Sequence, residues 1–363
     1  MEILSFVFGV FALLGALDRI TGNHLKLGEE FEKGVQSVGP LALAMVGMIT
    51  IAPVLADLLV PVCSKISVWL GIDPSFLSGF VANDMGGASI AAALSDTLWN
   101  RFHGLVVGAM MGVTVCFTVP VALQMVDEAY HKDMLTGILC GIATVPIGCM
   151  AGGLAMGLSF LEILWNLVPV IFVASLTCVG LVLNPNLCRK IFGGIGKIMT
   201  ILITVGLSAG IFTHITDIVL IPAMASVTDG FFVVCEIAMI LAGVFPLIAV
   251  ASRILKQPFS ALGEKMGMNE ASVVGLLSSL ANSIPTFTMV EKMNPKGIVV
   301  NLAFATSASF VLGDHLAFTM AFDSGAVLGM VVGKLTGGIC AVFVAFLLCR
   351  KENLKTSEKN RVN

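Results

Sequence analysis

Apolar stretches of about 20 residues recur along the whole chain, and this pattern constrains the fold more than any other feature. Of the 363 residues, 57% are hydrophobic and only 12% are charged. The mean hydropathy is +0.99. A soluble domain carries about 25% charged residues, so this chain lacks the polar surface that water requires. Because the stretches are continuously apolar rather than alternating, they predict an all-α polytopic membrane protein and not a β-barrel.

Two short polar breaks interrupt this pattern, about 200 residues apart. Each falls in a stretch, at 66–98 and 270–290, that is too short and too rich in Gly and Pro to cross a bilayer as one helix. We therefore predict two re-entrant helical hairpins among about nine full spans, a pairing that points to a transport site. The breaks are Asn83-Asp84-Met85-Gly86-Gly87 and Ala281-Asn282-Ser283-Ile284-Pro285, and the spans are expected at 2–17, 38–62, 104–126, 134–158, 161–183, 196–215, 231–252, 297–320 and 325–349.

The two halves of the chain resemble each other at an offset of about 195 residues. Gly71-Ile72-Asp73 aligns with Gly267-Met268-Asn269, Phe117 with Phe310, and Thr144 with Thr336. An excess of Lys and Arg marks cytoplasmic loops and sets the orientation of each span. We expect a first repeat at 1–183 whose hairpin opens outward, and a second, inverted repeat at 184–349 whose hairpin opens inward. A basic cytoplasmic tail follows at 350–363.

The first break carries the stronger candidate site. An intramembrane carboxylate is costly unless it is paired or hydrated, so Asp84 should have a partner such as a small organic cation. Asn83, Met85 and Gly86 complete this candidate substrate site, since flexible glycine lets the backbone approach a ligand. The alternative is that Asp84 only caps the second arm of the hairpin.

The second break is neutral. Asn282 and Ser283 offer an amide and a hydroxyl to a substrate, and Pro285 is suited to begin the second arm. A purely structural turn is the alternative. Asp314 and His315, deep in the predicted span 297–320, form a charged pair that fits a third wall of the site. The alternative is an Asp-His pair at the membrane edge, where Gly313 breaks the helix.

Several function classes are not supported. The net charge is -3 and no basic stripe with interleaved aromatics exists, so no nucleic-acid partner is expected. The nine cysteines form no CxxC motif or Cys/His cluster, so we predict no metal and no cofactor. An intramembrane enzyme would need a nucleophile and base, or metal ligands, within one span. The sequence shows neither, and we predict that the chain is not an enzyme.

The chain resembles the ethanolamine utilisation membrane protein family EutH, and the resemblance runs from the first loop to the last span. It implies a bacterial inner-membrane protein that lets ethanolamine enter the cell, with site roles for Asp84, Asn282, Asp314 and His315. Asn83 stands where the family pattern is not fixed. The resemblance rests on Leu41-Ala42-Leu43-Ala44-Met45-Val46-Gly47-Met48, Asp84-Met85-Gly86-Gly87, Pro146-Ile147-Gly148-Cys149, Leu280-Ala281-Asn282-Ser283-Ile284-Pro285, Gly313-Asp314-His315-Leu316 and Val332-Gly333-Lys334-Leu335.

Two modes of uptake remain open from the sequence. In the first, a secondary transporter binds ethanolamine as its ammonium ion, with Asp84 as the counter-ion at a midplane site between two hairpin tips. In the second, a channel-like facilitator passes the substrate without alternating access, and another small amine or polar solute remains an alternative substrate. The expected partners are ethanolamine and the lipid bilayer. The oligomeric state, including a homo-oligomer, is left open.

Overall fold

The computed structural model describes residues 2–80 and 87–362, and within these ranges every regular element is a helix. The prediction of an all-α protein is therefore confirmed. The first half of the chain contains α1 (Glu2–Ile20), α2 (Leu27–Gln36), α3 (Val38–Leu41), η1 (Ala42–Val46), α4 (Gly47–Leu70), η2 (Pro74–Gly79), α5 (Gly87–Leu94), α6 (Leu98–Arg101), η3 (Phe102–Gly112), η4 (Thr114–Thr118), α7 (Val119–Met125), η5 (Glu128–Tyr130), α8 (His131–Ala155), α9 (Phe160–Asn166) and α10 (Val168–Leu183). The second half contains α11 (Pro185–Thr216), α12 (Val227–Met266), α13 (Glu270–Ala281), α14 (Ile284–Thr288), η6 (Val290–Lys292), α15 (Pro295–Ala308), α16 (Asp314–Asp323), η7 (Ser324–Ala326) and α17 (Val327–Val362).

The described residues contain seven helices long and apolar enough to cross a membrane, or eight if α9 and α10, bent by 46°, form one span. One predicted span is wrong as a continuous helix. The stretch 297–320 is divided into α15 and α16 by residues 309–313, where the helix ends with Ser309 in an extended conformation. Phe310 adopts a left-handed backbone with φ of 64°, which a helix cannot contain.

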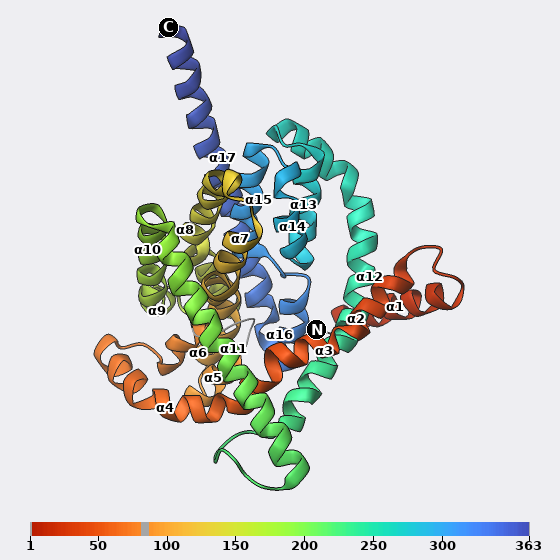
Figure 1. Ribbon diagram of the computed structural model, residues 1–363, viewed down its shortest axis with the longest axis vertical. Coiled ribbons are helices and arrows are strands. Elements are labelled where there is room, and N and C mark those ends of the chain that lie inside the picture. Colours follow the sequence, from red (N-terminus) through yellow and green to blue (C-terminus); the bar gives the residue numbers. More distant parts are fainter. Residues whose placement is uncertain (1, 81–86, 363) are drawn as a thin grey trace.

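Three helices, α8, α15 and α17, pack closely at the centre of the molecule (Figure 1). Glycines allow the backbones of α8 and α17 to approach each other: a Cβ on Gly148 would lie 2.6 Å from the Gly333 carbonyl oxygen, and one on Gly152 would lie 2.6 Å from that of Gly329. Since residue numbers rise along α8 as they fall along α17, the two helices run antiparallel. This close packing fixes the frame against which the shorter helices are placed.

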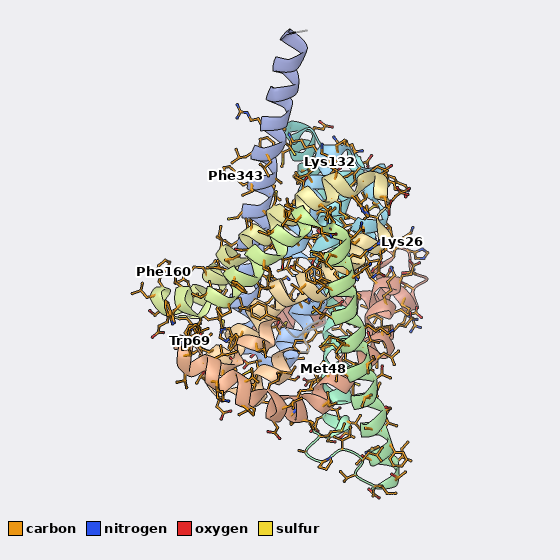
Figure 2. The ribbon with its side chains drawn as sticks, turned by 60° about the vertical axis from the view of Figure 1, so that its left-hand side comes forward. Lys26, Met48, Trp69, Lys132, Phe160 and Phe343 are labelled. Atoms are coloured by element: carbon orange, nitrogen blue, oxygen red, sulfur yellow. The ribbon has the colours of Figure 1, made fainter. Side chains whose placement is uncertain are left out.

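The remaining long helices surround this centre. In Figure 1 the α1–α2 pair lies beside α12 on one side, and α9 and α10 lie on the other. The buried Asp18 carboxylate joins α1 to α2, because it accepts hydrogen bonds from the backbone N–H groups of Leu27 (2.8 Å) and Gly28 (3.1 Å). Large apolar side chains such as Trp69 and Phe160 project from the periphery in Figure 2, as expected of a surface in contact with lipid.

Candidate functional site

Helices α13 and α14 form an antiparallel pair, called hairpin 2 below, whose two ends are tied together at its base. Asn269 caps α13 by accepting from the Ser272 backbone N–H (3.2 Å), and its side-chain amide donates to the Lys292 carbonyl (2.7 Å). Asn294, which caps α15, donates to the Gly267 carbonyl (2.7 Å). The chain therefore enters and leaves hairpin 2 at one place, and residues 281–283 form its tip.

A matching base closes the segment between α4 and α6, called hairpin 1 below. Asp73 caps η2 by accepting from the Ser75 backbone N–H (2.9 Å). Its second carboxylate oxygen accepts from the hydroxyls of Ser95 and Thr97, both at 2.8 Å. Thr97 caps α6, so this hairpin also begins and ends at one place. The predicted site residues Asn83, Asp84, Met85 and Gly86, between the two arms, lie outside the described residues.

The tip of hairpin 2 is held against the break between α15 and α16. The backbone N–H of Phe310 donates to the Ser279 carbonyl (3.0 Å), and that of Leu312 donates to the Leu280 carbonyl (2.9 Å). A Cβ on Gly313 would lie 2.1 Å from the Ala281 carbonyl oxygen, so only glycine fits at this position. The backbone groups released by the broken helix are thus satisfied by the hairpin, as a protein interior requires.

An aromatic cluster lines the same break. The Phe310 ring stacks on the His315 imidazole with centroids 5.0 Å apart, and meets the Phe117 ring edge-on at 5.6 Å. Phe310 and His315 are buried, and Phe117 is half-buried. The predicted Asp314 is the first residue of α16 and is half-buried. The structure therefore places Asp314 and His315 at the break, beside the tip of hairpin 2.

Three buried hydroxyls next to these elements have no hydrogen-bond partner among the residues that the structure describes. They belong to Ser283 at the tip, Ser309 at the break and Thr118 beside Phe117, and each residue is 0% exposed. A buried hydroxyl without a partner is costly, so its retention suggests that a bound molecule completes its hydrogen bonds.

Asn282 has a clear structural role at the tip. Its side-chain oxygen accepts from the Ile284 backbone N–H (2.8 Å), and Pro285 lies in the first turn of α14 as predicted. Asn282 also lines a cavity of about 670 Å³ whose other walls include Lys33 and Arg253. Among the described residues no group of His, Cys, Asp or Glu is arranged to hold a metal ion.

Comparison with known proteins identifies the family. A family model described as "Ethanolamine utilisation protein, EutH" matches residues 1–348. The chain belongs to the EutH family. The "Probable ethanolamine permease EutH" of Listeria monocytogenes is 43% identical to it, over 99% of this chain and 97% of that protein. A protein of the same name from Escherichia coli is 36% identical, over 97% and 96%. No solved structure matches the chain.

Membership of the EutH family agrees with the apolar helices described above. Together they identify the chain as a multi-pass protein of the bacterial inner membrane, as the resemblance implied. "Uncharacterized protein YxeR" of Bacillus subtilis is also similar, at 37% identity over 99% of this chain and 97% of that protein.

Sequence reasoning missed two buried polar residues of this EutH-family protein. Lys334, in α17, is 1% exposed, and its ammonium donates to the Ala109 carbonyl of η3. His103 is 1% exposed, and its Nδ1 lies 2.8 Å from the Ser75 hydroxyl at the base of hairpin 1. A signal for Lys334 was present, because a lysine in the middle of an apolar run is itself a functional candidate. His103 stands at the edge of its run, where the sequence gives no such signal.

Proposed function

We propose that this protein carries ethanolamine into the cell. In this proposal the substrate binds between the tips of the two hairpins, beside the break that separates α15 from α16. The observation that supports this best is a pair of buried hydroxyls, those of Ser283 at the tip and Ser309 at the break, that have no hydrogen-bond partner in the described part of the chain. Such groups fit a small polar ligand and are hard to explain in a core that only packs. The names of the curated relatives supply the identity of the ligand.

The chemistry of ethanolamine suits these groups. Its ammonium offers three N–H donors, and its hydroxyl both donates and accepts. The hydroxyl oxygens of Ser283, Ser309 and Thr118 have free acceptor positions. The ring faces of Phe117 and Phe310 attract a cation through their quadrupoles. In this proposal the Asp84 carboxylate is the counter-ion of the ammonium.

An ammonium ion in a region from which water is excluded requires compensating negative charge. Asp84 and Asp314 are the carboxylates that the sequence places at the hairpin tip and the helix break. In this proposal Asp84 faces the ammonium and Asp314 belongs to the third wall of the site.

An inverted repeat provides the frame for this site. Residues that align between the halves lie face to face at the centre: Phe117 contacts Phe310, and the Thr144 hydroxyl donates to the carbonyl of Gly337 (3.0 Å), next to its aligned residue Thr336. Such contacts are expected on a pseudo-twofold axis. The antiparallel packing of the aligned helices α8 and α17 supports the same arrangement.

Access from two sides follows from the repeat. The cavity that reaches Asn282 is bordered by Lys33 and Arg253, which the charge rule places in the cytoplasm. A smaller cavity of about 260 Å³ lies on the face of α5, closed by the ion pair of Arg101 and Asp323. We infer that these are the inner and outer approaches to one site.

Uptake of labelled ethanolamine into proteoliposomes tests the proposal. We expect saturable uptake that unlabelled ethanolamine inhibits, and no uptake in liposomes without the protein. Concentrative uptake that an uncoupler abolishes would favour a secondary transporter. Flux that only follows the substrate gradient would favour the facilitator. Absence of specific ethanolamine flux from well-inserted protein would contradict both.

A further inference from the structure

An apolar cavity of about 380 Å³ lies against helix α13 of hairpin 2, where α12, α13 and α17 meet. Helix α17 contributes Leu335, Ile339 and Val342, which share one face at helical spacing. Ile339 is 64% exposed, so the cavity reaches the surface of the protein beside α17. The exposed Phe343, labelled in Figure 2, continues this apolar surface along the same helix. In a membrane-spanning helix such a surface contacts lipid.

A cation lies at one end of the cavity. The Lys296 ammonium is 4.1 Å from the centroid of the Phe346 ring, which is one turn beyond Val342 on α17. The Lys296 ammonium also lies close to Gly267, because a Cβ on Gly267 would be 3.8 Å from its nitrogen. The two sequence neighbours of Gly267, Met266 and Met268, both line the cavity. In the described part of the chain no carboxylate lies within ion-pair distance of Lys296.

We propose that this cavity binds an acyl chain of an anionic phospholipid, with the headgroup phosphate on Lys296. The lining offers no hydrogen-bonding side chain, which excludes a sugar, a peptide or the polar substrate and leaves an aliphatic chain. Lys296 lies in the first turn of α15, at the end that the charge rule assigns to the cytoplasm, and the cytoplasmic leaflet carries anionic lipid. A zwitterionic lipid fits the apolar cavity equally well but gains less from the Lys296 ammonium, because its headgroup has no net charge.

The position of the cavity gives the lipid a role in the fold. Leu280 and Leu312 line it, and the backbones of these two residues form one of the hydrogen bonds that hold hairpin 2 against the helix break. A bound acyl chain therefore packs behind the contact that shapes the proposed site. The inference concerns a lipid and holds whichever substrate the protein carries.

Native mass spectrometry of the purified full-length protein with added phosphatidylglycerol or phosphatidylcholine tests the inference. Ile339→Trp fills the cavity, and Leu328→Trp, at an exposed position of α17 that does not line it, is the matched control. We expect Ile339→Trp to weaken phosphatidylglycerol binding about tenfold or more and Leu328→Trp to leave it unchanged. We expect Lys296→Gln to abolish the preference for phosphatidylglycerol over phosphatidylcholine.

Equal lipid binding by Ile339→Trp and Leu328→Trp would overturn the proposal. Should Ile339→Trp fail to fold, the wild-type protein with a photoreactive acyl chain on phosphatidylglycerol gives an independent answer. Adducts concentrated at residues 266–280 and 335–342 support the site. Adducts spread evenly over the lipid-facing helices overturn it.

Discussion

The bases of the two hairpins have the same design but differ in charge. Asp73 and Asn269 align between the halves, each follows a glycine in the left-handed conformation, and each caps the first helix of its hairpin. Each also binds the segment that leaves the hairpin. One of them is an ionisable carboxylate and the other a neutral amide. The cap of hairpin 1 can therefore change its charge, whereas the matching cap of hairpin 2 cannot.

The carboxylate is connected to a buried histidine. Asp73 accepts from the Ser75 hydroxyl, and that hydroxyl lies 2.8 Å from His103 Nδ1. Because the Ser75 hydrogen points to the carboxylate, Ser75 must accept the hydrogen of His103 Nδ1. Burial raises the pKa of the Asp73 carboxyl, but hydrogen bonds from Ser75, Thr97 and Ser95 outweigh it and hold the pKa below its ordinary value of 3.8. The comparison teaches that hairpin 1 is held at its base by an ionisable cap, whereas the matching cap of hairpin 2 is neutral.

Among the predicted substitutions, the one at the charged tip of hairpin 1 is expected to change ethanolamine uptake most. The segment between the arms of hairpin 1 carries Asp84, whereas the tip of hairpin 2 carries only neutral groups. We predict that Asp84→Asn raises the substrate concentration for half-maximal uptake by a factor of about 30 or more, since losing one partner of a buried charge pair costs about 2–5 kcal/mol. Asp57→Asn, at an exposed position, is the control and should transport normally. Near-normal uptake by Asp84→Asn would rule out the counter-ion role.

Docking of hairpin 2 on the helix break depends on Gly313. Gly313→Ala places a methyl group against the Ala281 carbonyl oxygen, and we expect it to destabilise the protein by about 1–3 kcal/mol and to reduce uptake. Gly194→Ala, where a Cβ meets nothing within 4 Å, is the matched control. Thermal unfolding in detergent measures the first effect. Equal unfolding midpoints for the two variants would show that the close approach of Gly313 to the Ala281 carbonyl does not contribute to stability.

Removal of the buried hydroxyl at the tip of hairpin 2 is expected to have a smaller effect on ethanolamine uptake. Ser283→Ala removes an acceptor without leaving a protein group unpaired, so the fold should keep its stability while ethanolamine affinity falls by about tenfold or less. Thr288→Ala, on the same hairpin but outside the cavity that reaches Asn282, removes a hydroxyl that already donates to the Pro285 carbonyl (2.8 Å). That control should bind substrate normally. Unchanged uptake in Ser283→Ala would remove this residue from the site.

Exchange of the two caps should give the smallest effect, visible in the pH dependence of stability. The folded pKa of Asp73 lies below its unfolded value of 3.8, so its bonds stabilise the fold fully above that pH and are lost as the pH falls through the folded pKa. Asp73→Asn should remove this loss. Asn269→Asp should be destabilised near neutrality, where its carboxylate meets the Lys292 carbonyl, and should recover in acid. Thermal unfolding midpoints measured between about pH 3 and pH 7 give the pH dependence of stability for the wild-type protein and both variants. The same pH dependence in all three proteins would contradict the comparison.

Apolar composition was sufficient to predict an all-α protein with many membrane-spanning helices, because hydrophobic length is a local property. The break at 309–313 could not be predicted as such. Its backbone groups are satisfied by Ser279 and Leu280, about 30 residues away in sequence, and only the fold brings these segments together. Gly313 was the one local hint. The roles of Lys334 and His103 likewise depend on partners in distant segments, Ala109 and Ser75.

The central claim is that two hairpins approach one site from opposite faces of the membrane. Single cysteines at position 84 and at position 283, in a background without the nine native cysteines, can be labelled with a membrane-impermeant reagent in oriented vesicles. We predict that the cysteine of Asp84→Cys reacts only from outside and that of Ser283→Cys only from inside, and that ethanolamine slows both reactions. Labelling of both positions from the same side would contradict the inverted arrangement and the shared site.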